Sequence, residues 1–95
     1  MLGKKVIIRG DRSGVFFGTL AEKNGTEVRL TDCRRLWYWE GANSISQLAA
    51  EGTKKPKECK FTISVAEIVI TDAIEIIPCT EEAIQNIEGV KVWKM

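Results

Sequence analysis

The amino-acid sequence predicts a mainly β protein of the α+β class, with a small, strongly bent antiparallel sheet or an SH3-like barrel and one or two short helices. Two observations predict this class. Apolar residues alternate with period two in short segments over residues 4–39, and turn residues separate these segments. The alternation then stops, and residues typical of helix starts follow at two places. With 95 residues, the chain is expected to form a single domain, residues 1–95.

The first part of the chain is predicted to form four strands in a meander. They are expected at residues 4–9, 15–23, 26–31 and 34–39. Gly18 is expected to mark a bulge or a sharp bend, because glycine weakens a regular strand. Asn24-Gly25 predicts a type I′ hairpin, since both residue types tolerate positive φ. Asp32-Cys33 is expected to be a short link before the fourth strand.

Two short helices are predicted further along the chain. Residues 44–51 form the first, which Gly52 ends, and Ser44 with Gln47 three positions later matches a capping box. The second begins at Thr80, where two acidic residues follow in the first turn, as the helix dipole favours.

The segments around these helices have weaker patterns. Residues 53–58 are expected to be a basic, exposed loop. Residues 61–65 are predicted to be a strand, after which the apolar positions change phase, so a bulge or turn is expected near Ala66-Glu67. Residues 90–93 could add an edge strand.

The charge of the chain is small in total but uneven. The net charge is +1, which argues against a membrane or nucleic acid as the main partner. Residues 1–60 carry 12 Lys/Arg and 7 Asp/Glu, whereas residues 61–95 carry 2 and 6. This asymmetry indicates either a basic face or head-to-tail packing of subunits. A domain this small is marginally stable alone, so we expect a homo-oligomer.

Cysteine and histidine usage predicts a cytoplasmic protein without a metal or other cofactor. Cys33, Cys59 and Cys79 are widely spaced, and the chain has no histidine. This set favours neither a disulfide framework nor structural zinc, and it fits a reducing compartment. The N-terminal apolar run is far shorter than the ~7–15 residues of a signal peptide, and no segment reaches the ~20 apolar residues of a membrane span.

The residue types present also predict a protein that binds rather than catalyses. Without histidine, the usual acid–base group at neutral pH is missing. Neither a Ser/His/Asp nor a Cys/His set can form, and no clustered carboxylates indicate a metal site or a glycosidase pair. We therefore expect no catalytic residues.

Residues 34–47 contain the main candidate binding residues. Alternation places Arg35, Trp37 and Trp39 on one face of the predicted strand, and Arg34 on the other. A guanidinium beside indoles can pair with an anion and stack on a planar group. The helix start that follows offers free backbone N–H groups to an anion. The neutral donors and acceptors nearby are Asn43, Ser44 and Gln47.

These features predict a pocket for an anionic, nucleotide-like ligand. Arg34 and Arg35 would hold phosphate, Trp37 or Trp39 would stack on the base, and the neutral residues would bond sugar or base edges.

Structural roles compete with this hypothesis. Tryptophans are large apolar bodies, and at least one is expected in the core. Ser44 and Gln47 could simply cap their own helix. Arginine and tryptophan are also enriched at protein interfaces, so the same segment could form a subunit or host-protein interface. Nucleic-acid binding through the basic first 60 residues is a weaker alternative, which requires steep salt dependence.

The turn at residues 9–14 is a second candidate. Two glycines bracket Arg12 and Ser13, and their backbone N–H groups could face an anion, with Arg9 close by. The spacing differs from that of a P-loop, and residues of this kind more often form only a hairpin turn.

Specific strings in the chain resemble an uncharacterised family of short proteins associated with tailed-phage and prophage genomes. They lie at residues 6–16, 34–49, 51–54, 59–61 and 75–80. The family has no established activity, so the resemblance implies no site. In size and in its arginine-plus-aromatic segment, the chain is also similar to small oligomeric phage proteins that sequester cyclic nucleotide signals of bacterial defence, although no motif aligns. This analogy of class suggests a phage anti-defence role.

Overall fold

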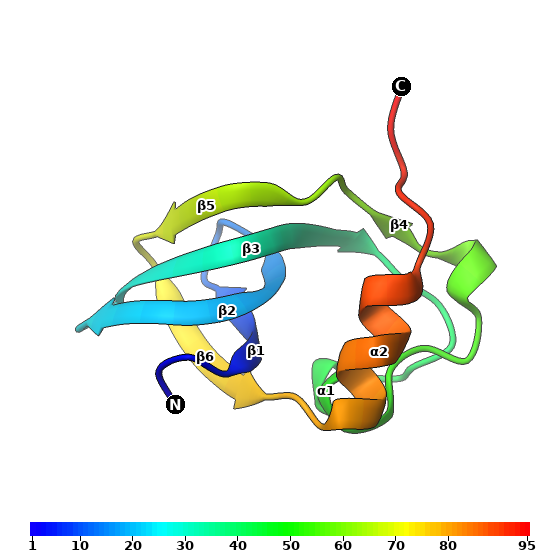
Figure 1. The fold of residues 1–95 in the computed structure, drawn as a ribbon, viewed down its shortest axis with the longest axis horizontal. Helices are drawn as coiled ribbons and strands as arrows, with labels where there is room; N and C mark the ends of the chain where they lie inside the picture. The colour runs from blue at the N-terminus through cyan, green and yellow to red at the C-terminus, as the bar shows by residue number, and fades with distance from the viewer.

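The computed structural model describes residues 1–95 and contains six strands, two α-helices and one short 3₁₀ turn (Figure 1). The elements in chain order are β1 (Lys5–Gly10), β2 (Val15–Asn24), β3 (Glu27–Tyr38), α1 (Ile45–Glu51), η1 (Pro56–Glu58), β4 (Lys60–Phe61), β5 (Val65–Ile70), β6 (Ala73–Pro78) and α2 (Glu81–Gly89).

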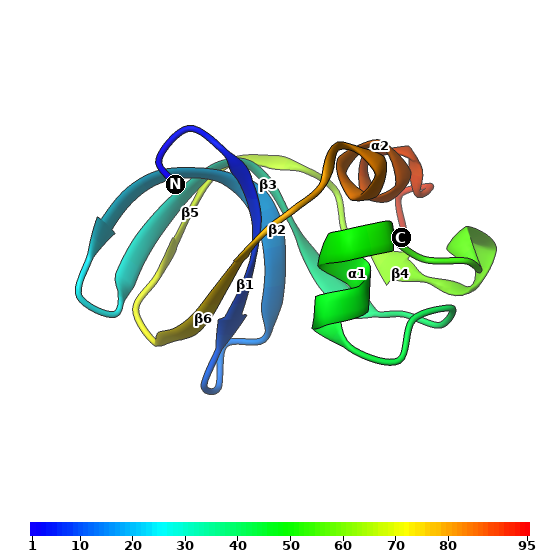
Figure 2. The same ribbon diagram turned by 90° about the horizontal axis from the view of Figure 1, so that it is seen from below.

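The strands form one bent antiparallel sheet that does not close. Five of them lie in the order β5-β3-β2-β1-β6, and the short β4 pairs with the end of β3 beside β5. β5 and β6 are neighbours in sequence but stand at opposite ends of this order without pairing. Figure 2 shows the sheet curling between these two edges, with both helices on one side. The predicted strongly bent antiparallel sheet with short helices is confirmed, and the barrel stays open.

Two apolar clusters hold the fold together. The first lies inside the curled sheet, and its fully buried members include Val6, Ile8, Phe16, Leu20, Leu30 and Cys33. The second lies between the other face of the sheet and the helices, and includes Ile7, Phe17, Leu36, Leu48, Phe61 and Ile87. Neighbouring residues of β1 and β2 therefore enter different clusters, as the period-two geometry of strands requires.

A β-bulge in β3 replaces the predicted link at Asp32-Cys33. The single residue Gly18 of β2 stands opposite both Asp32 and Cys33, and Asp32 has a positive φ of 47°. The extra residue changes the phase of the strand, because Leu30 and Cys33 both enter the inner cluster. The expected third and fourth strands are thus one continuous strand, and of the bulge or sharp bend predicted at Gly18 the structure has the bulge.

Three other local predictions were wrong in detail. The β2–β3 hairpin pairs Asn24 with Glu27, and of its two loop residues only Gly25 has positive φ, which excludes a type I′ turn. The strand expected at residues 61–65 is interrupted after Phe61, and the chain re-enters the sheet at β5. The edge strand expected at residues 90–93 is reduced to one parallel bridge between Phe61 and Val92.

Local capping defines both helices, as predicted. The Ser44 hydroxyl accepts the Gln47 N–H at 3.2 Å, and the Gln47 side chain accepts the Asn43 N–H at 2.9 Å. The Thr80 hydroxyl accepts the Ala83 N–H at 3.1 Å at the start of α2. Neither helix has the length and apolar character needed to cross a membrane.

Candidate functional site

A hollow of about 230 Å³ lies between the β1–β2 turn and the end of β3. We call it the turn hollow; its lining residues are Arg12, Ser13, Gly14, Val15, Arg35, Leu36, Trp37 and Trp39. Four of the residues predicted to bind a ligand therefore meet here, although they come from two segments about twenty residues apart in the chain. Sequence reasoning had singled out these two segments separately.

The turn side of the hollow is held in place by Asp72, which lies between β5 and β6. Its carboxylate accepts the backbone N–H groups of Arg12 at 2.8 Å and of Ser13 at 3.0 Å, and also the Ser13 hydroxyl. The Ser13 hydroxyl and the Arg12 N–H lower the pKa of Asp72 because they stabilise its charged form. The backbone donors of the turn that were expected to face an anion are thus partly occupied.

Arg35 forms the opposite wall. Its guanidinium lies over the Phe16 ring, 4.5 Å from the centroid, and donates a hydrogen bond to the Ser13 carbonyl. Gly14 leaves room for it, since a Cβ there would stand 3.2 Å from Arg35 Nη1. Neither Arg35 nor Arg12 makes an ion pair. Both positive charges in this hollow therefore lack a carboxylate partner.

The two indoles of the hollow differ in exposure. Trp39 is half-buried and packs against the helix-side cluster, as expected of a core tryptophan. Trp37 is 61% exposed, and its ring lies parallel to that of Trp93, with an interplanar angle of 9° and centroids 6.3 Å apart. A largely exposed indole offers a flat apolar face for stacking.

Arg34 does not reach the hollow. It is buried on the helix side of β3, with the guanidinium over the Phe61 ring. It donates hydrogen bonds of 2.9–3.1 Å to four backbone carbonyls: those of Phe61, Thr62, Ile87 and Val90. Burial lowers the pKa of Arg34. The predicted phosphate contact is corrected here, because this side chain ties the end of α2 and the strand β4 to β3.

Four other predicted site residues also lie outside the hollow. Arg9 forms an ion pair with Glu75 at 2.9 Å, across the β1–β6 pairing. Asn43, Ser44 and Gln47 use their polar groups to cap α1, as the structural alternative expected. At the start of this seven-residue helix, the Gln47 N–H donates to the Ser44 hydroxyl and the Leu48 N–H to the Ser44 carbonyl.

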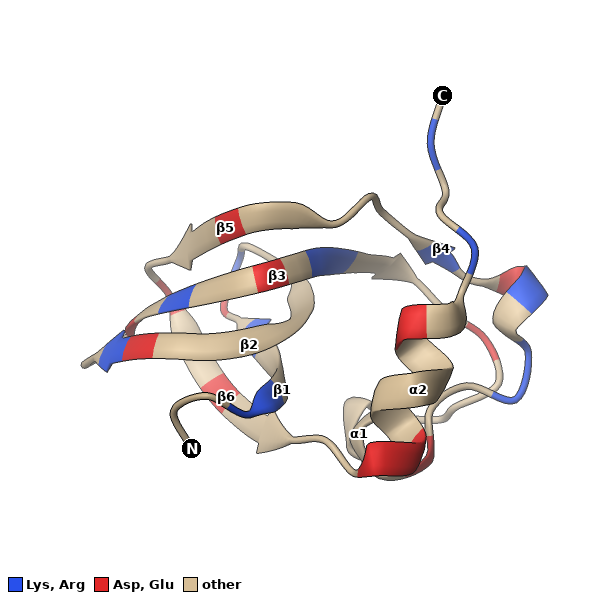
Figure 3. Cartoon of the chain, viewed as in Figure 1, with Lys and Arg blue, Asp and Glu red and all other residues tan.

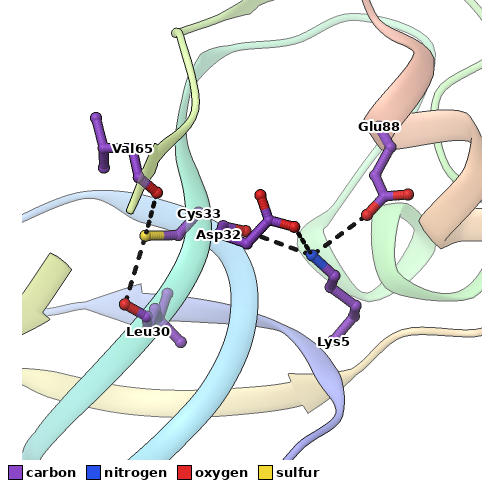
Figure 4. A network of polar contacts seen from close by, with 6 residues as sticks. All are labelled: Lys5, Leu30, Asp32, Cys33, Val65 and Glu88. Carbon is purple, nitrogen blue, oxygen red and sulfur yellow. Dashed lines mark hydrogen bonds and ion pairs between the residues drawn. The ribbon is translucent and has the colours of Figure 1, made fainter. Parts of the chain in front are cut away.

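A second, polar hollow of about 280 Å³ lies between the sheet and α2. Lys5 Nζ contacts Asp32 Oδ2 at 2.9 Å and Glu88 Oε2 at 3.3 Å, as Figure 4 shows. Burial opposes the charge of Lys5, but the hydrogen bonds and charges of the two carboxylates outweigh it and raise the pKa. The two carboxylates neutralise the charge of Lys5, so this hollow is less suited to an anion than the turn hollow.

Sequence reasoning missed Trp93 and Lys60. Trp93 contacts Trp37 because the Trp93 N–H donates to the Phe61 carbonyl at 2.9 Å, which holds the C-terminal tail beside β4. Lys60 Nζ lies 5.6 Å from the Trp93 centroid and 5.7 Å from that of Tyr38. The only available signal was an aromatic residue and a lysine in segments without strong pattern.

Residues 3–87 match the family described as Domain of unknown function (DUF6948). The chain belongs to this family. No curated protein and no solved structure matches the chain. The match covers the turn hollow and Arg34 but ends before Trp93, and its description assigns no activity to any of these residues.

Proposed function

We propose that the chain is a non-catalytic, self-associating protein that binds an anionic, nucleotide-like ligand in the turn hollow. The observation that carries this proposal is the meeting of Arg12, Arg35 and the exposed ring of Trp37 around one hollow, with no carboxylate paired to either arginine. Arginines bind phosphate through several N–H groups, and an indole face stacks on a base. The binding set leaves out Arg9, Arg34, Asn43, Ser44 and Gln47, which lie outside the hollow.

The fold supports a preformed site. Asp72 fixes the turn, and the Phe16 ring with the Ser13 carbonyl fixes the Arg35 guanidinium. A preorganised guanidinium loses less conformational entropy when it binds an anion. If the chain is phage-encoded, as the sequence resemblance suggests, sequestration of a nucleotide signal in the bacterial cytoplasm is the role we propose for such binding.

Isothermal titration against mono-, di- and cyclic nucleotides tests the proposal. We expect binding that Arg35→Gln and Arg12→Gln each weaken about tenfold or more, since a charged hydrogen bond contributes roughly 1.5–3 kcal/mol. Arg9→Gln is the matched control, because Arg9 already pairs with Glu75 outside the hollow. No heat with any nucleotide, or an equal loss in the Arg9 variant, would contradict the proposal.

A second candidate function is an interface with another copy or with a host protein. The exposed aromatic side chains of Trp37, Tyr38 and Trp93 favour it, with 61%, 44% and 45% of their surfaces in water. Aromatic residues of this kind are enriched at interfaces. This reading predicts that Trp37→Ala abolishes self-association in sedimentation, whereas the ligand proposal predicts an intact oligomer that has lost nucleotide binding.

A further inference from the structure

A larger hollow lies on the other side of the Trp37–Trp93 pair. Its volume is about 570 Å³, and we call it the tail hollow. It is built from η1, the end of α2 and the C-terminal tail, and its lining residues are Pro56, Lys57, Cys59, Gly89, Lys91, Val92 and Trp93. Ligand pockets usually measure ~300–1,000 Å³, so the tail hollow lies within this range and the turn hollow below it. A ligand confined to the turn hollow would occupy only the smaller of these two hollows.

The paired indoles join the two hollows. Trp37 lines the turn hollow and Trp93 lines the tail hollow, and the two rings lie parallel with centroids 6.3 Å apart. Both rings remain about half or more exposed. Flat aromatic faces next to one another accept successive bases, because every base has a π-face.

Cations flank this aromatic pair on both sides. Arg12 and Arg35 line the turn hollow, Lys57 and Lys91 line the tail hollow, and Lys60 lies over the Trp93 ring. None of these five side chains takes part in an ion pair. Figure 3 shows the basic segments of η1, β4 and the tail gathered at one end of the molecule, away from the acidic first turn of α2.

Only two carboxylates lie on the segments that frame these cations from η1 and the end of β3. Glu40 accepts a hydrogen bond from the Tyr38 hydroxyl at 2.8 Å, and Glu58 belongs to η1. Beside the tail hollow, the three lysines therefore outnumber these carboxylates. Beside the turn hollow, the Asp72 carboxylate bonds the turn backbone but forms no ion pair with Arg12 or Arg35. A single phosphate can neutralise the cations of one hollow but not of both.

We propose that the two hollows form one site for a ligand of at least two nucleotides joined by a phosphodiester bond. A base stacks on each exposed indole, and phosphates contact Arg12 and Arg35 on one side and Lys57 and Lys91 on the other. This inference rests on the proposed function and extends it from a nucleotide-like ligand to a phosphodiester-linked one. A linear strand and a cyclic dinucleotide share this chemistry.

The test is a titration of the full chain with AMP, linear pApA and cyclic di-AMP, each at 50 and 200 mM salt. We expect at least one of the two dinucleotides to bind ten or more times more tightly than AMP and to show the steeper salt dependence, since each additional phosphate contact releases counterions. Tight binding of pApA alone identifies linear strands as the ligand source, and tight binding of cyclic di-AMP alone identifies cyclic dinucleotides. Tight binding of both means that the site recognises two phosphodiester-linked nucleotides, whether linear or cyclic.

A double substitution in the tail hollow separates this inference from the proposed function. Lys57→Gln with Lys91→Gln should reduce dinucleotide affinity to that of AMP and leave AMP affinity within twofold. Lys4→Gln with Lys23→Gln, two lysines outside both hollows, is the matched control and should change neither affinity. If AMP binds through Arg35 and neither dinucleotide binds better, the inference is wrong and the proposed function stands. If no nucleotide binds, both are wrong.

Discussion

The two sides of the end of β3 carry adjacent arginines with opposite roles. On the helix side, Arg34 is 4% exposed and donates to four backbone carbonyls. On the other side, Arg35 donates to one carbonyl, lies over an aromatic ring and borders a hollow. Structural and binding arginines therefore differ in how many of their N–H groups the chain already occupies. A guanidinium surrounded by carbonyls has few N–H groups left, whereas one with a single carbonyl and no carboxylate can still bind an anion.

The bulge at Asp32 decides which arginine has which role. Because the bulge shifts the phase of β3, Cys33 enters the inner cluster and Arg34 then faces α2. In a regular strand, alternation from Leu30 would instead bring Arg34 to the inner face. The functional geometry of the strand end therefore depends on one irregular position, Asp32, which lies directly opposite Gly18.

Replacing Arg34 should have the largest effect on the stability of the fold. Arg34→Met keeps the apolar stem but removes all four charged hydrogen bonds. The Thr62 and Val90 carbonyls then lose their donor, whereas the Phe61 and Ile87 carbonyls keep backbone N–H donors. We therefore expect a loss of about 3–5 kcal/mol in the free energy of unfolding. Urea unfolding measures this loss. Arg35→Met is the matched control and should cost about 1 kcal/mol, because it removes one hydrogen bond. Equal losses of stability in the two variants would show that Arg34 and Arg35 do not differ in their structural roles.

Gly18→Ala should have the next largest effect, because it disturbs the bulge itself. A Cβ at Gly18 would lie 2.5 Å from Cys33 Cβ, so the two strands must move apart. Overpacking of this kind costs about 1–3 kcal/mol, again measured by urea unfolding. Gly89→Ala is the control, since nothing lies within 4 Å of a Cβ there. We expect this control to be neutral or slightly stabilising, and a Gly18→Ala protein of unchanged stability would contradict the role of the bulge.

The local features of the fold were predictable and the long-range ones were not. Ser44 and Thr80 cap their helices through residues three positions away, and the alternation around Val28 and Leu30 identifies a strand with a buried face. Arg34 could not be assigned correctly, because the carbonyls that surround it belong to residues 27 to 56 positions later in the chain.

The candidate site shows the same division. Arg12 and Arg35 were each recognised from their own segments, but the pairing of β2 with β3 that brings them to one hollow depends on register. That register is set partly by the bulge, which has no distinct sequence signal at Asp32. Trp93 was missed because its contact with Trp37 requires the tail to pair with Phe61. This pairing is a single bridge, which leaves no periodic pattern in the sequence.

The smallest expected effect concerns Asp72, which holds the turn on the Arg35 side. Its pKa is lowered in the folded state by the Ser13 hydroxyl and the Arg12 N–H, so it contributes stability at pH values above its unfolded pKa of about 3.9. This contribution should disappear as the pH falls through the lower folded pKa, where the carboxylate becomes protonated in both states.

Thermal unfolding of the unmodified chain and of Asp72→Asn between pH 6 and pH 2.5 measures this contribution. The variant should be less stable at pH 6, and the two midpoints should converge toward pH 2.5, because protonation removes the same charge that the substitution removes. The effect should be smaller than those of Arg34→Met and Gly18→Ala, since the carboxylate lies near solvent. A gap between the midpoints that stays constant with pH would mean that the turn is held by the shape of its backbone rather than by the charge of Asp72. The preorganisation of the turn hollow would then have to come from Arg35 and Gly14 alone.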